Sequence, residues 1–131
     1  MYLLDTNACI RILNGNCAAI SARIRTHAPS EICLSSVVKA ELIYGARRSA
    51  RVAENLRLLD RFFEPFASLP FDDACAEHYG QIRTELETGG TPIGPNDLLI
   101  AAIARNHGQI LVTHNVREFS RVIGLKLEDW E

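Results

Sequence analysis

Short apolar segments alternate along this chain with longer segments in which apolar residues recur every three or four positions. The short segments are typical of buried β-strands, and the longer ones of amphipathic helices. Parallel strands must be joined by long crossovers, usually helices, so this alternation favours parallel pairing. The sequence therefore predicts an α/β fold: a three-layer α/β/α sandwich with a mainly parallel central sheet, built as one domain over residues 1–131.

The alternation assigns a residue range to each expected element. We expect strands at Tyr2–Leu4, Glu31–Leu34, Ala67–Phe71, Gln109–Thr113 and Leu125–Leu127. We expect helices at Thr6–Leu13, Cys17–His27, Ser36–Arg48, Arg51–Pro65, Asp73–Thr88, Asn96–His107 and Arg117–Val122. Glycine and proline, which interrupt regular structure, occur at most of the breaks between these segments.

Composition and charge exclude several classes of protein. Hydrophobic residues make up 47% of the 131-residue chain, enough for one well-buried core. The formal net charge of -2 is not that of a uniformly basic nucleic-acid-coating protein, so any contact with nucleic acid must be local. Uncharged segments such as Leu98–Ala104 are far shorter than the roughly 20 residues of a membrane span, and no secretory signal opens the chain. We therefore expect a cytoplasmic protein without a membrane partner.

The cysteines do not form a disulfide or zinc framework in the sequence. Cys9, Cys17, Cys33 and Cys75 contain no Cys-x-x-Cys pair. Cys75 and His78 have the spacing of a zinc half-site, but no second half-site follows at a usual distance. We expect free thiols that pack as small hydrophobic side chains.

Polar residues follow three of the expected strands where each strand ends. Asp5 follows the first strand, Ser36 the second and Asn115 the fourth. Ligands of open parallel sheets bind beyond the carboxyl ends of the strands, so these residues would share one edge if the three strands are neighbours. Each residue type also caps helices well, and this alternative stays open for each of them.

Further acids occur where an unpaired carboxylate would be costly. Glu41 shares a predicted helix face with apolar residues, so its charge must be paired, protonated or bound to a metal. Asp97 opens the most apolar helix of the chain, and Glu118 stands three residues past Asn115. The alternatives are a distant arginine partner for Glu41, a helix-dipole role for Asp97 and a solvated position for Glu118.

The acids are more informative together than singly. A parallel sheet would gather Asp5, Glu41, Asp97 and Glu118 at one edge, with Asn115 beside them. Carboxylates about 4 Å apart repel by several kcal/mol at an effective dielectric near 20, so such a cluster needs cations. All-oxygen ligands favour Mg²⁺ (or Mn²⁺) over zinc, and carboxylate-held ions of this kind support phosphodiester hydrolysis. The pattern predicts a metal-dependent phosphodiesterase site.

Four segments carry a family resemblance in their order and spacing. They are Leu4–Asn7, Ser35–Ser36 followed by Ala40–Ala46, Pro92–Asp97, and Leu111–Phe119. With these segments the chain resembles the PIN-domain ribonucleases, specifically the VapC toxins of type II toxin-antitoxin modules, over Leu3 to Trp130. The resemblance implies a single PIN-like nuclease domain over residues 1–131.

The resemblance also implies which residues form the catalytic site. Asp5, Glu41 and Asp97 match the metal-binding acids of the family, with Mg²⁺ (or Mn²⁺) as the ion. The fourth acidic position of the family, often Asp, is Asn115 here, so either Asn115 or Glu118 completes the site. The residues expected to orient these carboxylates are Thr6, Asn7, Ser36 and Thr113.

By the same resemblance, we expect the chain to be a growth-inhibiting endoribonuclease that forms a homodimer and is neutralised by a cognate VapB-like antitoxin. Its segments Pro92–Asp97, Asn115–Phe119 and Glu128–Trp130 are most similar to the VapC branch that cuts the anticodon loop of initiator tRNA. We expect a basic patch for the RNA backbone beside the acidic edge, with a solvated helix end as the alternative. The patch consists of Arg47, Arg48 and Arg51.

Other functions agree less well with these residues. A receiver-type signalling module needs an acid pair after its first strand, and a HAD-type phosphatase needs a second Asp where Asn7 stands. A housekeeping PIN-type nuclease that processes RNA or DNA without an antitoxin remains an alternative. A non-catalytic PIN scaffold is the other, although such proteins usually lose the acids that this chain retains.

Overall fold

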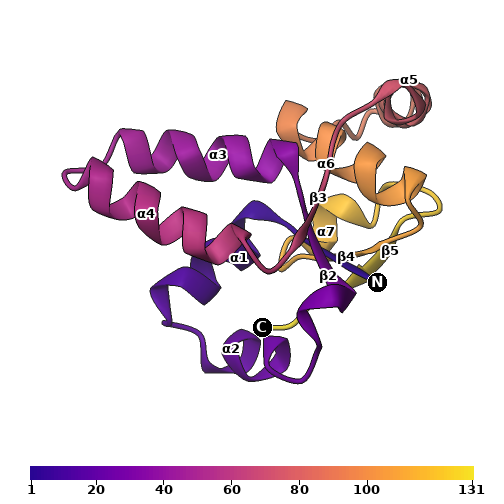
Figure 1. Cartoon of the computed structure of the whole chain (residues 1–131). Helices are drawn as coiled ribbons and strands as arrows, with labels where there is room; N and C mark the ends of the chain where they lie inside the picture. The colour runs from indigo at the N-terminus through magenta and orange to yellow at the C-terminus, as the bar shows by residue number, and fades with distance from the viewer.

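Five short strands form one fully parallel sheet in the computed structural model, which describes all 131 residues (Figure 1). The strands are β1 (Tyr2–Leu4), β2 (Ile32–Ser35), β3 (Ala67–Leu69), β4 (Ile110–Val112) and β5 (Lys126–Glu128). Their order across the sheet is β3-β2-β1-β4-β5. β1 is central, with Leu3 opposite Cys33 on one side and opposite Leu111 on the other. The prediction of a mainly parallel sheet is confirmed.

Helices connect every pair of consecutive strands. They are α1 (Thr6–Asn14), α2 (Ala18–Ile24), α3 (Ser36–Arg47), α4 (Val52–Phe63), α5 (Asp73–Thr88), α6 (Pro95–Asn106) and α7 (Val116–Phe119), with a short 3₁₀ helix η1 (Pro29–Glu31). The chain runs outward from β1 to β3, then crosses back to β4 and β5. Because such crossovers are almost always right-handed, the two directions place helices on opposite faces of the sheet. Figure 1 shows α1 and α2 on one side and α5 and α6 on the other, which gives the predicted sandwich.

The core lies where the central strands meet α6. Leu3, Leu4 and Leu111 are completely buried, as expected for strands covered on both faces. Every residue from Ile100 to Ala104 of α6 is also buried. A helix apolar on all sides must be enclosed, and α5 supplies the outer cover by packing against α6. The prediction that α6 is central is confirmed.

Helices α3 and α4 form an antiparallel hairpin that extends away from the sheet (Figure 1). The Ser35 hydroxyl begins α3 by accepting a hydrogen bond from the Val38 amide at 3.1 Å. Along α4 only Leu59 is fully buried, whereas Leu58 keeps 41% of its surface exposed. The hairpin therefore presents apolar side chains outside the core.

The predicted strands and helices all occur, with differences at their ends. The predicted helix Cys17–His27 stops at Ile24, because His27 turns inward and stacks on Trp130 with ring centroids 5.1 Å apart. The last predicted helix begins at Val116 and ends at Phe119, earlier than the predicted Arg117–Val122. The sequence prediction missed η1, since three residues carry no helical periodicity. The cysteines are free thiols, as expected.

None of the helices combines the length and the apolar character that crossing a membrane requires.

Candidate active site

The strand order reverses between β1 and β4, and this reversal defines the candidate site. Crossovers leave these neighbouring strands in opposite directions, so the chain opens a crevice beyond their carboxyl ends. Asp5 follows β1 directly, and its amide donates to the Val112 carbonyl of β4 at 3.1 Å. Thr113 follows β4 and is also buried. Residues from both ends of the sequence thus meet at one edge, as predicted.

Asp5 has both of the roles that the sequence left open. It caps α1, since its Oδ1 accepts a hydrogen bond from the Ala8 amide at 2.8 Å. It also belongs to the acidic group, because burial raises its pKa and the charges of Glu131 and Glu41 raise it further. A hydrogen bond from Thr113 acts in the opposite direction and favours the ionised form. Asp5 is therefore a buried, oriented carboxyl with neighbouring acids.

Glu41 faces α1 across the crevice rather than the core. Its Oε1 accepts a hydrogen bond from the Thr6 hydroxyl at 2.7 Å. The prediction that its helix face is buried is wrong: Glu41 is half-buried, and Tyr44 on the same face is 61% exposed. No arginine pairs with Glu41 in the structure. The face instead borders a cleft of about 720 Å³ that Thr6, Glu41 and Tyr44 help to line.

Asp97 occupies the first turn of α6, which Gly94 caps and Pro95 begins. Burial and the charges of Asp5, Glu118 and Glu41 raise its pKa to about 6. The helix-dipole alternative is compatible with this position, but a helix N-terminus favours the ionised form and would lower the pKa. The four acids therefore act on one another, as the sequence predicted.

A hydrogen bond connects Asn115 and Glu118, the two residues that the sequence leaves as alternatives for the fourth position. The Asn115 amide nitrogen Nδ2 donates to Glu118 Oε2 at 3.1 Å, and the Asn115 backbone amide donates to Thr113 Oγ1 at 3.0 Å. Since the Glu118 charge raises the pKa of Asp97, Glu118 faces the crevice. Asn115 thus holds the carboxylate of an acid three residues away beside the crevice.

The expected orienting residues divide into two kinds. Thr6 and Thr113 hydrogen-bond to acids of the site. Asn7 and Ser36 are exposed on the cleft wall and make no hydrogen bond to an acid. The structure therefore does not support the prediction that they orient the carboxylates. The buried hydroxyl at this edge belongs to Ser35, the last residue of β2, which caps α3.

The sequence prediction missed Glu131. This C-terminal residue comes close enough to Asp5 to raise its pKa, and it pairs with Arg11 of α1 at 3.3 Å. His114 lies nearby and contacts Asp129 at 3.0 Å. No periodicity marks Glu131, because only the pairing of β5 with β4 brings this residue back to the crevice.

The predicted arginine patch lies at the turn between α3 and α4. Arg47 is exposed, and Arg51 pairs with Glu54 at 3.4 Å. Arg48 lies over the Tyr44 ring, 5.5 Å from its centroid, and donates to its hydroxyl at 3.1 Å. Since Tyr44 lines the cleft, Arg48 is the member of the patch that is connected to the acidic edge.

A parallel sheet with a reversal crevice and mutually interacting acids defines a class of protein. The PIN domain family model matches residues 2–125, so the chain belongs to the PIN-domain family. Relatives in Shigella flexneri and Haemophilus influenzae are named tRNA(fMet)-specific endonuclease VapC and Ribonuclease VapC2. The first is 44% identical and the second 40%, each over 98% of this chain and 97% of the relative. Within the family, the chain is a VapC-type protein.

Solved structures agree with this assignment over nearly the whole chain. The VapBC2 structure from Rickettsia felis, bound to a DNA fragment from its promoter, matches with a TM-score of 0.92 and 39% identity, covering 99% of this chain and 98% of that chain. The DNA-bound VapBC structure from Salmonella typhimurium gives a TM-score of 0.93 and 40% identity with the same coverage.

The raised pKa of Asp97 generates a prediction about stability. The pKa of Asp97 is about 6 in the folded protein, whereas its ordinary value, which applies in the unfolded chain, is 3.8. Ionisation of Asp97 therefore opposes folding. The resulting loss in the free energy of unfolding is absent below pH 3.8 and reaches its full size above pH 6. We expect Asp97→Asn, in buffer with chelator, to raise the free energy of unfolding at pH 8 by about 1 kcal/mol, a value reduced for solvent screening of a half-buried group.

Urea denaturation at pH 8 and pH 3.5 measures this effect. The gain should vanish at pH 3.5, where Asp97 is protonated in both states. Asp73→Asn is the matched control, because Asp73 also lies in the first turn of a helix but away from the acids. It should give no gain at either pH. A loss of stability at pH 8 specific to Asp97→Asn would contradict the acid cluster.

Proposed function

We propose that this protein is a metal-dependent endoribonuclease toxin that cleaves tRNA(fMet) in its anticodon loop. The observation that carries the proposal is the crevice at the β1–β4 reversal, where burial and the charges of three other acids raise the pKa of Asp97. The relatives named tRNA(fMet)-specific endonuclease support the substrate. They are similar over 98% of this chain, so they share the whole fold and not only a motif.

The donor set of the crevice suits Mg²⁺ or Mn²⁺. Asp5, Glu41 and Asp97 would hold the ion, with Glu118 or Asn115 as the fourth donor, and all of these offer oxygen atoms. A cation would offset the burial and the like charge that together raise the pKa values of Asp5 and Asp97. When bound, it supplies positive charge against the charge that develops on the phosphodiester during hydrolysis.

The residues of the chain position this chemistry. The Thr6 hydroxyl holds Glu41, and the Thr113 hydroxyl and the Ala8 amide hold Asp5. Hydrogen bonds of this kind fix carboxylate orientation before substrate binds. Water, and not the ribose 2′-hydroxyl, is the proposed nucleophile, so the products carry a 5′-phosphate and a 3′-hydroxyl.

Purified protein tests the proposed activity. With Mg²⁺ or Mn²⁺ we expect one cut in the anticodon loop of tRNA(fMet), and no cut with excess EDTA. Asp5→Asn, Glu41→Gln and Asp97→Asn should each lower the cleavage rate at least about 100-fold, since metal catalysis contributes several kcal/mol. Sequencing of the RNA ends identifies the position and the terminal groups.

Each outcome bears on a separate part of the proposal. Asp73→Asn, outside the crevice, should cleave at the wild-type rate. Cleavage of other RNAs with tRNA(fMet) left intact would contradict the proposed substrate but not the proposed nuclease activity. Full activity in EDTA, or 2′,3′-cyclic phosphate ends, would contradict the mechanism.

The exposed Tyr44 and Arg48 form a surface suited to single-stranded RNA. Aromatic rings stack on unpaired bases, and arginine contacts phosphates. We expect Arg48→Ala to lower kcat/KM for tRNA(fMet) about 3- to 10-fold and to reduce the salt dependence of binding by about one counterion. Replacing Arg47, Arg48 and Arg51 together should have a larger effect of the same kind, without changing metal binding.

Arg83 is a matched control for Arg48. It lies over the Tyr79 ring at 6.0 Å and donates to the Tyr79 hydroxyl at 2.9 Å, the same arrangement on a different helix. Arg83→Ala should leave cleavage and its salt dependence unchanged. Equal effects of the two substitutions would show that the pair on α3 has no special role in RNA binding.

We propose that a VapB-like antitoxin binds the apolar groove between α1 and the α3–α4 hairpin, and that the toxin forms a homodimer. The groove has a volume of about 350 Å³, and Ile10, Leu42 and Leu58 line it. Ile10 and Leu58 are each about two-fifths exposed, which is typical of a surface that a partner covers. The related VapBC structures from Rickettsia felis and Salmonella typhimurium support a partner of this kind.

A charged substitution in the groove tests the partner surface. Leu58→Asp should weaken inhibition by the antitoxin more than about tenfold, because the complex would bury an unpaired charge. Cleavage by the toxin alone should not change. Ile123→Asp, at an apolar residue that is 71% exposed elsewhere, should leave inhibition intact. Light scattering of the free toxin and of the complex measures the dimer; a monomer in both would contradict it.

A further inference from the structure

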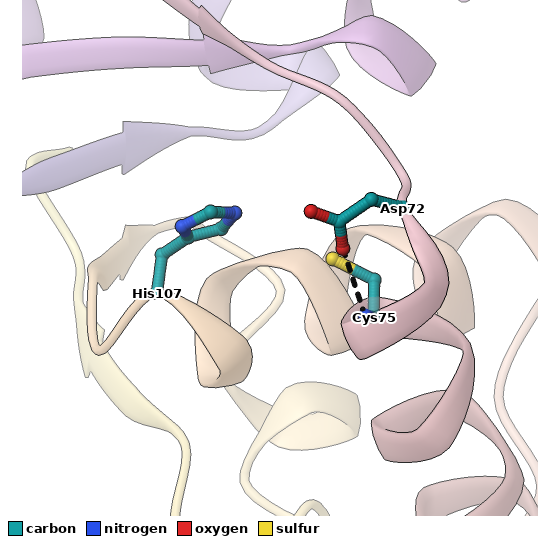
Figure 2. A group of neighbouring side chains, drawn as sticks. All are labelled: Asp72, Cys75 and His107. Atoms are coloured by element: carbon teal, nitrogen blue, oxygen red, sulfur yellow. Dashed lines mark hydrogen bonds between the residues drawn. The ribbon is translucent and has the colours of Figure 1, made fainter.

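A second group of metal-ligating side chains lies outside the acidic crevice, at the open end of the α5–α6 hairpin (Figure 2). Asp72 and Cys75 come from the start of α5, and His107 comes from the end of α6. One ligand atom of each residue lies within 4.8 Å of the other two. The antiparallel packing of the two helices therefore brings a carboxylate, a thiol and an imidazole to one point.

His107 gives the clearest indication that a ligand belongs here. Its Nε2 atom is buried and has no hydrogen-bond partner in the structure. Buried polar atoms are almost always paired, and an unpaired one costs on the order of 1–3 kcal/mol. Figure 2 shows the imidazole ring pointing toward Asp72 and Cys75. An unprotonated imidazole nitrogen in this position is a ready metal ligand.

Asp72 keeps one carboxylate oxygen available. Its Oδ1 caps α5 by accepting a hydrogen bond from the Cys75 amide at 3.1 Å. The cap uses this oxygen alone, and the carboxylate also contacts the Cys75 thiol. The cap and the Cys75 thiol, which donates to the carboxylate, lower the pKa of Asp72. The same carboxylate can hold the helix and bind an ion.

Cys75 is enclosed and unsuited to act as an exposed nucleophile. Its side chain is completely buried, and burial raises the pKa of the thiol. Its Sγ receives a hydrogen bond from Asn106 Nδ2 at 3.6 Å, which fixes the sulfur beside the end of α6. Loss of the thiol proton at neutral pH would require a cation to replace it, and metal binding does this.

We propose that Asp72, Cys75 and His107 bind a zinc ion, with water as the fourth ligand. A sulfur, nitrogen and oxygen donor set suits zinc and does not suit Mg²⁺. Tetrahedral zinc, with bonds of about 2.0–2.3 Å, needs ligand atoms about 3.3–3.6 Å apart. Separations of up to 4.8 Å reach this geometry by small side-chain rotations.

The site differs from the zinc half-site considered in the sequence. His78 does not belong to the group of clustered ligand atoms, and its Nδ1 accepts a hydrogen bond from Arg105 Nε at 2.9 Å. The actual third member, His107, is far from Cys75 in sequence. A bound ion would connect the beginning of α5 to the end of α6, opposite the end of α6 that carries Asp97. It would therefore stabilise the hairpin without entering the crevice.

Cobalt spectroscopy of the purified protein tests this proposal with a signal specific to the thiolate. Co²⁺ is added to metal-free protein in excess Mg²⁺, which occupies carboxylate sites. We expect a thiolate-to-cobalt charge-transfer band and tetrahedral visible bands at one equivalent, both displaced by Zn²⁺. Zinc at 100 times its Kd should also raise Tm by roughly 10 °C. Absence of a charge-transfer band would overturn the proposal.

Substitutions identify the ligands. Cys75→Ser should abolish the charge-transfer band. It should also lower zinc affinity more than about 100-fold, which exceeds the loss expected for a residue that only hydrogen-bonds to a metal ligand. Asp72→Asn keeps a helix cap while removing the charge, so it serves as a second variant that folds. It should lower zinc affinity at least about tenfold. Circular dichroism in chelator checks that both variants are folded.

Two further substitutions are matched controls. Cys17→Ser changes a half-buried thiol away from the cluster, and Asp73→Asn changes the acid next to Asp72. Both should retain the band and the wild-type zinc affinity. A band that persists in Cys75→Ser, or is lost in Cys17→Ser, would assign the metal to a different thiol. Equal zinc affinity in wild type and Asp72→Asn would exclude the carboxylate.

Discussion

The parallel pairing of β1 with β4 is the constraint on which the candidate site depends. These strands are neighbours in the sheet but lie at opposite ends of the chain, and Leu4 stands opposite Val112. The pairing continues one residue further, through the hydrogen bond from the Asp5 amide to Val112. Because crossovers leave the two strands in opposite directions, no helix closes the space beyond them. The crevice follows from the topology, and the acids are placed by the elements that border it.

The acids are kept close at a cost in folding free energy. Burial and like charge raise the pKa values of Asp5 and Asp97, so each carboxylate is held in an unfavourable environment. Hydrogen bonds from Thr6 and Thr113 fix the orientation of the carboxylates without neutralising them. Repulsion that the fold tolerates in this way is typical of a site built to receive a cation. The rest of the core, above all the buried helix α6, supplies the stability that offsets this cost.

Helix α6 connects the acidic crevice with the proposed zinc site. Its first turn carries Asp97 in the crevice, and His107 follows its last turn at the group with Asp72 and Cys75. The two donor sets differ in chemistry: the crevice offers oxygen atoms, and the second group offers sulfur, nitrogen and oxygen. One enclosed helix thus separates the oxygen donors of the crevice, which suit hard cations, from the mixed donor group, which suits zinc.

The sequence by itself determined the order of the elements and the residues that follow each strand. Periodicity predicted all five strands. The acids Asp5 and Asp97 could be identified because the end of a strand and the start of a helix can both be located from the sequence. Only the tertiary structure decided that Glu41 faces a cleft, that Asn115 holds Glu118, and that the final residue Glu131 returns to Asp5. It also decided that Cys75 meets His107 and not His78. Those relations join residues far apart in sequence or depend on side-chain hydrogen bonds, and neither leaves a periodic signal in the chain.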